Sequence, residues 1–295
     1  MYPTLIHKVN AILAQYDYPL TLRQIHYRIV AEVNKDYPNT RSAYNGLSKQ
    51  LVRAWERGDV DYRRIEDRVR ATIVDRFALH DPFALYEMMA DQIEAFASHY
   101  SRNPWEDQEN YVEVWIEKDA LSTTISRVAT DIYRVPVAVN RGYGSFSFVR
   151  KGAERIEAND KSLHVLYFGD FDPSGEDMVR DLQRRIMKYR TGGQVIQVHK
   201  IALTHEQIVK HNVPEDLAKP KDVRTKAFID KHGAKTAELD ALPPETLQKI
   251  VKDAIEEYID PKKWQESVDL TLTDKPIIAN KVAAVKRRLI GRRWP

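Results

Sequence analysis

Three acidic residues stand directly after apolar segments that have the character of buried strands. Glu117 follows the segment 112–116, and Asp170 and Asp172 follow the segment 163–168. Because Asp170 and Asp172 are two positions apart, both side chains point to the same side of an extended backbone. Carboxylate oxygens are the ligands that Mg²⁺ prefers, and crowded carboxylates repel one another unless a cation compensates them. The three residues therefore predict a Mg²⁺ site. The alternative is that the segment with Asp170 and Asp172 only forms a turn that caps a helix.

The composition limits the chemistry and the class of protein. The chain has no cysteine, which excludes disulfides, thiolate zinc sites and cysteine nucleophiles. Its nine histidines are scattered and show no spacing typical of metal-binding motifs. With 43% hydrophobic and 30% charged residues it is a globular chain and not a disordered one. No window approaches the roughly 18 apolar residues of a membrane span, and no secretory signal is visible. We therefore expect a soluble, cytoplasmic protein without a membrane partner.

The elements that must position the acidic residues follow from the alternation of apolar and amphipathic segments. Strands are expected at 112–116, 135–139, 163–168 and 195–203, with helices at 120–132, 146–156 and 176–187 between them. This alternation predicts an α/β fold with a mainly parallel sheet that helices cover on both faces. Ligands of such sheets gather at the carboxyl ends of the strands, where the acidic residues stand. From residue 204 onward the pattern predicts helices.

The first hundred residues are mainly helical. Thr21 is a good N-cap for a helix with apolar residues at 22, 25, 29 and 33, and a second helix is expected from about 40 to 56, before the turn Arg57-Gly-Asp59. Two short helices, a turn and a basic strand-like segment fit a winged helix-turn-helix, which often binds DNA. A pair of helices that serves only packing is the alternative.

The charge is unevenly distributed. The net charge of +3 is too small to indicate nucleic-acid binding by itself. However, the segment 281–295 holds six Lys or Arg residues and no acid, which leaves 40 − 43 = −3 for the rest of the chain. Such a tail, with Arg287 and Arg288, could contact phosphates, or it could be a solvated terminal helix.

Two segments that contain the acidic residues resemble a known family. Val114–Leu121 and Phe168–Gly175 are similar to the paired signatures of the Toprim domain, in the form found in the A subunit of topoisomerase VI and its meiotic double-strand-break relatives. Further similar segments are Arg141-Gly-Tyr143, Ala202-Leu-Thr204 and Lys235–Leu242, in the same order and spacing over about 111–242. The resemblance implies a winged-helix domain at 1–105, a Rossmann-like Toprim domain at 106–260 and a basic helical tail at 261–295.

The resemblance extends upstream to Thr21-Leu-Arg-Gln-Ile-His-Tyr27, where the family has its catalytic tyrosine. At about 100° per residue, Tyr27 lies about 140° from Leu22 and therefore off the apolar stripe of its helix. His26 replaces the first aromatic residue of the family's pair, and the segment after Tyr27 looks more like small Toprim proteins of phage and mobile elements.

The family's chemistry implies a role for each of these residues. Tyr27 would form a covalent 5′-phosphotyrosyl link, and Arg23 would supply the positive charge that favours its phenolate. Mg²⁺ on the three carboxylates would hold the scissile phosphate, and Lys118 and Arg141 would contact phosphate, although a salt bridge is an equal alternative for Lys118. The expected activity is Mg²⁺-dependent DNA cleavage, with or without rejoining, by an isomerase of the type IIB topoisomerase A-subunit kind.

The expected partners follow from the same resemblance. They are double-stranded DNA and a second copy of the chain, because in the family the tyrosine and the metal site that cut one strand come from different subunits. The sequence has no GxxxxGK[ST] loop, so DNA relaxation would need a separate ATP-binding B-type subunit. Two alternatives stay open: a hydrolytic Toprim nuclease in which metal-activated water replaces the tyrosine, and a non-catalytic DNA-binding subunit.

Overall fold

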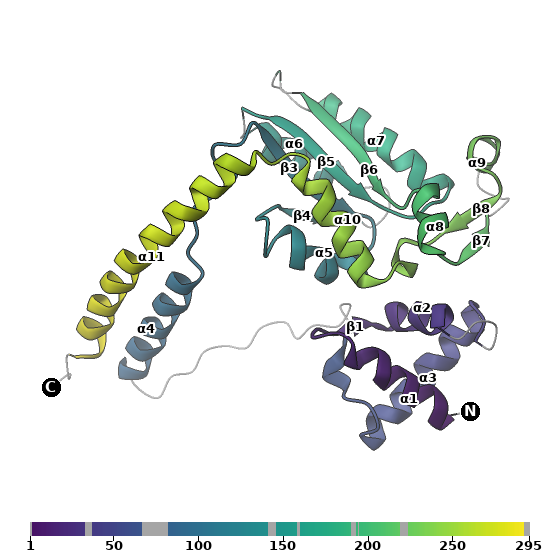
Figure 1. Cartoon of the computed structure of the whole chain (residues 1–295), viewed down its shortest axis with the longest axis horizontal. Coiled ribbons are helices and arrows are strands. Elements are labelled where there is room, and N and C mark those ends of the chain that lie inside the picture. Colours follow the sequence, from purple (N-terminus) through teal and green to yellow (C-terminus); the bar gives the residue numbers. More distant parts are fainter. Residues whose placement is uncertain are drawn as a thin grey trace. The chain divides into compact units, whose positions relative to one another are not determined.

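The computed structural model (Figure 1) describes residues 2–32, 37–66, 82–140, 146–157, 160–189, 193, 195–218 and 224–291. Its contacts divide the chain into two compact units. Unit 1 comprises Met1–Arg70 and Asn110–Tyr258, and unit 2 comprises Ala71–Glu109 and Ile259–Pro295. The three-domain division expected from the sequence remains a prediction. No described helix is long and apolar enough to cross a membrane.

A four-stranded parallel sheet forms the centre of unit 1. Its strand order is β4-β3-β5-β6, with bounds Val137–Val139, Asn110–Ile116, Ser162–Phe168 and Ile196–Ala202. The two central strands, β3 and β5, pair from Asn110↔Ser162 to Ile116↔Phe168. The expected α/β fold with a parallel sheet is confirmed. The apolar residues of β3 and β5 run almost without interruption because both faces of these strands are covered.

Helices cover the two faces of the sheet. The α5 helix (Ser122–Ala129) packs with α10 (Pro244–Glu256), and α6 (Phe146–Glu157) packs with α7 (Pro173–Tyr189). The connections from β3 to β4 and from β4 to β5 run in opposite directions along the sheet, which places α5 and α6 on opposite faces. Trp115 of β3 is fully buried in the core beneath α6 and α7.

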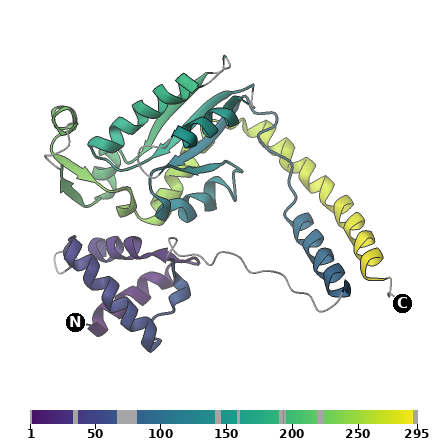
Figure 2. The same cartoon turned by 180° about the vertical axis from the view of Figure 1, so that it is seen from behind.

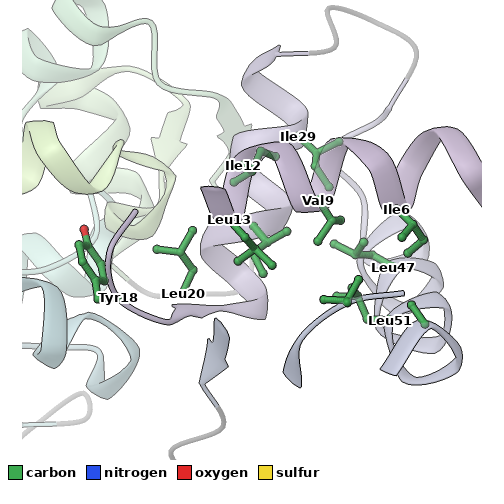
Figure 3. Close-up of a cluster of buried hydrophobic side chains, with 12 residues drawn as sticks. Ile6, Val9, Ile12, Leu13, Tyr18, Leu20, Ile29, Leu47 and Leu51 are labelled. Atoms are coloured by element: carbon green, nitrogen blue, oxygen red, sulfur yellow. The ribbon is translucent and has the colours of Figure 1, made fainter. Parts of the chain in front are cut away.

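Three helices at the start of the chain form a second core within unit 1 (Figure 3). They are α1 (Tyr2–Ala14), α2 (Leu22–Glu32) and α3 (Arg41–Arg57), accompanied by the parallel pair β1 (Leu20–Thr21) and β2 (Ile65–Glu66). Their apolar sides bury Ile6, Val9, Ile12, Leu13, Leu20, Ile29, Leu47 and Leu51, among others. The two expected helices are confirmed. Thr40 caps α3 by accepting from the Ala43 N–H, and Gly58 ends it with φ 76°. The winged-helix assignment remains a prediction.

The segment after β6 is not purely helical, contrary to the prediction. It contains α8 (His205–His211), α9 (Thr225–His232) and the antiparallel ribbon of β7 (Glu215–Leu217) and β8 (Lys235–Ala237). A single-turn helix, η3 (Leu239–Ala241), leads into α10. The ribbon was not predicted because each of its strands has only three residues and β7 is exposed throughout. Neither strand therefore shows the alternation of apolar and polar residues that indicates a strand in a sequence.

Unit 2 is an antiparallel pair of helices. They are α4 (Pro82–Ser98) and α11 (Pro261–Ile290), which lie side by side in both views (Figure 1, Figure 2). Near one end of the pair, the rings of Trp105 and Trp264 pack edge to face with their centroids 5.8 Å apart.

Gly175 is expected to be needed for the close approach of two backbone segments. A Cβ at this position would lie 2.2 Å from the Asp170 carbonyl oxygen. We therefore expect Gly175→Ala to destabilise unit 1 by about 1–3 kcal/mol, the range typical of forced overpacking. The control is Gly46→Ala in the interior of α3, where the new Cβ meets no atom within 4 Å and should stabilise the helix by about 1 kcal/mol. Urea unfolding followed by circular dichroism measures both; equal effects of the two substitutions would contradict the close approach.

Candidate functional site

The site lies at the carboxyl ends of the two central strands. In the order β4-β3-β5-β6 the chain runs from β3 to one side of the sheet and then returns to the other, so the connections diverge between β3 and β5. A crevice between diverging connections is where parallel sheets bind ligands. Glu117 follows β3 and Asp170 follows β5 at this crevice, and the Glu117 N–H donates to the Phe168 carbonyl at 2.9 Å.

Backbone contacts bring a distant segment to the same place. Phe171 and Ala237 exchange two backbone hydrogen bonds, of 2.9 and 3.0 Å, so that the β7–β8 ribbon adjoins the loop after β5. The N–H of Leu239 then donates to Asp170 Oδ1 at 2.8 Å. These three bonds place Glu238 and Asp240, which flank Leu239, beside Asp170.

The result is a cluster of three carboxylates. One oxygen each of Asp170, Glu238 and Asp240 lies within 4.8 Å of the other two, and this group could hold a metal ion. Asp170 is 9% exposed and Asp240 1% exposed. Three negative charges so close together, two of them on buried residues, repel one another unless cations compensate them.

Two basic side chains of the protein supply that compensation. The Lys118 ammonium pairs with Asp170 Oδ1 at 2.8 Å, with Asp240 Oδ1 at 3.0 Å and with Glu238. Arg23 of α2 pairs with Glu238 Oε2 at 2.5 Å and with Asp240 Oδ2 at 2.7 Å. Burial lowers the pKa of both basic groups, but the carboxylates raise it by more, so both pKa values end above their ordinary range. Lys118 and Arg23 therefore stay positively charged.

Two of the carboxylates at this edge, Asp170 and Glu117, hold protons more tightly than in water. Burial raises the pKa of Asp170 to about 7, and the opposing effect of Lys118 is smaller. Burial also raises the pKa of Glu117. The Asp170 N–H, which donates to Glu117 Oε2 at 3.2 Å, lowers this pKa by less. Part of the negative charge at this crevice is therefore removed by protonation near neutral pH.

Tyr27 faces the same cluster from α2. It is 7% exposed, and the Arg23 guanidinium carbon lies 6.0 Å from the centre of its ring. Burial, followed by Asp240 and Glu238, raises the pKa of Tyr27 and Arg23 lowers it, and together these effects give a pKa of about 12. The phenol is therefore neutral at pH 7, and the charge of the cluster acts directly on it.

A cavity of about 590 Å³ joins the tyrosine to the carboxylates. Its lining includes Tyr27 from α2 and Asn39 from the segment before α3, and Asp170, Asp172, Asp216 and Glu238 from the sheet side. Among the described residues that line it, four are acidic and none is Lys or Arg. A phosphate that enters this cavity therefore meets negative charge unless a cation comes with it.

The structure brings the predicted metal ligands to one edge of the sheet, with different contacts for each. Asp170 belongs to the carboxylate cluster. The Glu117 carboxylate accepts from the Asp170 N–H and from the Tyr167 hydroxyl, the latter at 3.4 Å. Asp172 accepts from the Gly175 N–H at 2.6 Å in the first turn of α7, which is the helix-capping arrangement that the sequence left open. It also lines the cavity.

The predicted phosphate-binding residues lie in different places. Lys118 forms the salt bridges described above, which is the alternative considered for it, and its side chain is 17% exposed. Arg287 and Arg288 lie in the last turn of α11 in unit 2, where both are exposed. Arg141 lies outside the described residues. The DNA-binding role of all four remains a prediction.

Three polar residues at this edge were not singled out from the sequence. Glu238 and Asp240 fall within 235–242, which resembles the family's C-terminal part but carried no assigned role. Asn140 follows β4 and is 6% exposed, with its N–H donating to the Ile116 carbonyl at 3.0 Å. For Asn140 the available signal was its position directly after an apolar strand, as for Glu117.

Comparison with known proteins adds no assignment. Neither a scan against models of known protein families nor a search of curated proteins gives a significant match. The function of the chain therefore has to be argued from the site itself.

Asp170 should make the stability of the protein depend on pH. Its pKa is about 7 in the folded state against 3.8 in the unfolded state, so between these pH values the folded state binds a proton that the unfolded state has lost. Stability should therefore fall as pH rises through this window, by at most about 1.4 kcal/mol per pH unit, and Asp170→Asn should remove this part of the dependence. Urea unfolding of the wild-type and Asp170→Asn proteins at pH 5 and pH 8 in EDTA tests this. If their free energies of unfolding differ by the same amount at both pH values, the raised pKa is contradicted.

Proposed function

We propose that this chain cleaves double-stranded DNA by transesterification through Tyr27, assisted by Mg²⁺ on the cluster of Asp170, Glu238 and Asp240. The observation that carries the proposal is the cavity, which Tyr27 lines together with Asp170 and Glu238. A potential nucleophile and a potential metal site therefore meet at one space. The proposal includes the assignment of the N-terminal helices as a winged helix and of the sheet as a Toprim domain, on the resemblance of Val114–Leu121 and Phe168–Gly175.

The donor set suits a hard divalent cation. All three candidate ligands are carboxylates, which is the chemistry that Mg²⁺ and Ca²⁺ prefer and that thiophilic metals do not. Bound there, the cation would bring positive charge to a DNA phosphate and reduce the negative charge that now faces Tyr27. Lys118 and Arg23 already neutralise part of the negative charge of the cluster. They would therefore hold the three carboxylates together when no cation is present.

The chemistry assigned to Tyr27 conserves the number of phosphodiester bonds. Its phenolic oxygen forms the new bond to phosphorus, the bond from phosphorus to the 3′ oxygen breaks, and that oxygen takes up a proton. The phenol must lose its own proton, which its raised pKa opposes. Arg23 lowers the pKa of Tyr27 and is therefore the positioned group that favours the phenolate.

Two observations on Tyr27 favour hydrolysis as the second candidate. Tyr27 is 7% exposed and its pKa is about 12, both of which are unfavourable for a nucleophile. A nuclease that uses water would need the carboxylates and not the tyrosine. The two functions therefore make opposite predictions for Tyr27→Phe.

We expect Tyr27→Phe to lose protein-linked cleavage of supercoiled plasmid in Mg²⁺ or Mn²⁺ by a factor of about a thousand or more, because the attacking oxygen is gone. The matched control is Tyr18→Phe. Tyr18 is equally buried at 6% exposed and has a pKa raised to about 12 by burial, but it is not among the residues that line the cavity. Detergent-stopped reactions, analysed with and without proteinase, measure the linked product.

The outcomes separate the three functions. Loss of linked breaks in Tyr27→Phe and in Asp240→Asn, with activity in Tyr18→Phe, supports transesterification. Free-ended breaks that survive Tyr27→Phe make the protein a hydrolytic nuclease. If the wild-type protein binds DNA but does not cut it, even when a candidate ATP-binding B-type partner is added, the chain is a DNA-binding subunit.

The cavity also predicts that one chain supplies both halves of a site. Tyr27 and Asp170 line it within the same chain, whereas the family resemblance implied sharing between subunits. We therefore expect an equimolar mixture of Tyr27→Phe and Asp170→Asn proteins to stay inactive. Recovery of cleavage to a tenth or more of the wild-type rate would show that the tyrosine of one chain acts with the carboxylates of another.

A further inference from the structure

Two histidines that are 35 residues apart in the sequence meet on one face of the sheet. His164 belongs to β5 and His199 to β6, the strand at one end of the order β4-β3-β5-β6. The register pairs His164 with Gln197, so His199 lies two residues further along the neighbouring strand and points to the same face. His164 Nδ1 and His199 Nε2 are 3.1 Å apart. These two residues are here called the histidine pair.

The distance between these two nitrogens is close to that between two imidazoles on one metal ion. Zinc binds histidine nitrogen at about 2.0–2.1 Å in a tetrahedral arrangement, which sets two such nitrogens about 3.3 Å apart. Imidazole suits Zn²⁺, Ni²⁺ and Cu²⁺, whereas Mg²⁺ prefers oxygen ligands. The histidine pair therefore suits a different class of metal from the carboxylate cluster.

One contact fixes which nitrogen of His164 carries the proton. His164 Nε2 lies 3.2 Å from Asn110 Oδ1, and because an amide oxygen only accepts, Nε2 is the protonated nitrogen. The lone pair of His164 Nδ1 therefore points toward His199. A hydrogen bond from the far nitrogen of a histidine to an oxygen is the contact that orients metal-binding imidazoles.

Both rings of the histidine pair favour the uncharged form. Burial lowers the pKa of His164, and His199 lowers it further. Burial also lowers the pKa of His199, and Glu257 raises it by less. Metal ions bind the neutral imidazole. In the hydrogen-bonded pair the His199 Nε2–H donates to His164 Nδ1, and the other tautomer of His199, with its proton on Nδ1, presents the second lone pair.

The end of α10 covers the histidine pair and brings an oxygen ligand with it. The Tyr258 ring packs on both imidazoles, with its centroid 4.2 Å from that of His164 and 6.0 Å from that of His199. Glu257 directly precedes Tyr258 and is exposed, and its negative charge acts on His199. Two histidines, a glutamate and a water form a known set of zinc ligands. Glu257 is therefore the third ligand that this place offers.

We propose that the histidine pair, with Glu257 and water, binds Zn²⁺ or a related transition-metal ion, which joins β5, β6 and the end of α10. The site is separate from the carboxylate cluster, because His164 precedes Asp170 by six residues, about 20 Å along an extended strand. The proposal therefore holds whether or not Tyr27 cleaves DNA.

The test is calorimetric titration of the full chain with Zn²⁺ in excess Mg²⁺, which competes for oxygen ligands. We expect one binding site that is lost in His164→Gln and in His199→Gln. Its affinity should fall about 10–100-fold in Asn110→Ala, the range typical of residues that orient a ligand. Wild-type protein that binds Zn²⁺ no more tightly than His199→Gln reduces the pair to a hydrogen bond and overturns the proposal.

Two control variants separate this site from other places where zinc could bind. His211 on α8 also has a pKa lowered by burial but lies outside the histidine pair, so His211→Gln should bind Zn²⁺ as the wild type does. Asp170→Asn should also retain the site. Loss of binding in Asp170→Asn, with binding kept in His199→Gln, would assign the zinc to the carboxylate cluster and overturn the proposal.

Crystals soaked with Zn²⁺ guard against variants that bind less because they are misfolded. Anomalous scattering at the zinc edge should show a peak about 2.0–2.1 Å from His164 Nδ1 and from His199 Nε2. A peak at the carboxylate cluster alone, or an unchanged contact of 3.1 Å between the two imidazoles in crystals that hold zinc elsewhere, overturns the proposal.

Discussion

The structure of the site depends on the compensation of buried negative charge. Asp170 and Asp240 are almost inaccessible to solvent, and Glu238 lies against them. Lys118 follows the end of β3. Its ammonium pairs with Asp170 in the loop after β5 and with Asp240 in the turn η3, and so connects these three segments. Removing one partner from such a group leaves an uncompensated buried charge. Compensation of the negative charge by Lys118 and Arg23 is therefore the condition under which these segments can meet.

The same constraint reaches the tyrosine. Arg23 is one helical turn before Tyr27 and pairs with Glu238 and Asp240, so the cluster helps to fix the helix that carries the phenol. The carboxylates raise the pKa of Tyr27 and Arg23 lowers it. A change of charge at the cluster is consequently felt at the tyrosine, which couples a bound cation to the reactivity proposed for the phenol. By contrast, the carboxylate of the buried Glu113 accepts hydrogen bonds from the Arg155 guanidinium and from the indole Nε1–H of Trp115, and it stands apart from this coupling.

Much of this was predictable from the sequence, for identifiable reasons. The two central strands, β3 and β5, are mostly apolar segments. Parallel strands place the residues that follow them at one edge of the sheet, so the sequence could predict that Glu117 and Asp170 lie close together. Glu238 could not, because it reaches Asp170 through the Phe171–Ala237 bridge, a contact between distant segments with no local signature. Asp172 had two compatible structures, a ligand and a helix cap, and spacing alone does not separate them.

The most direct measurement of the central claim is the anomalous scattering of Mn²⁺ in crystals of the protein grown or soaked with that ion. The account predicts a peak within coordination distance of Asp170, Glu238 and Asp240, with the ammonium of Lys118 moved away from at least one of them. A peak held by Glu117 and Asp172 without Glu238 and Asp240 would contradict this ligand set. The absence of any peak at this edge of the sheet, in crystals where Mn²⁺ binds elsewhere, would contradict the metal site itself.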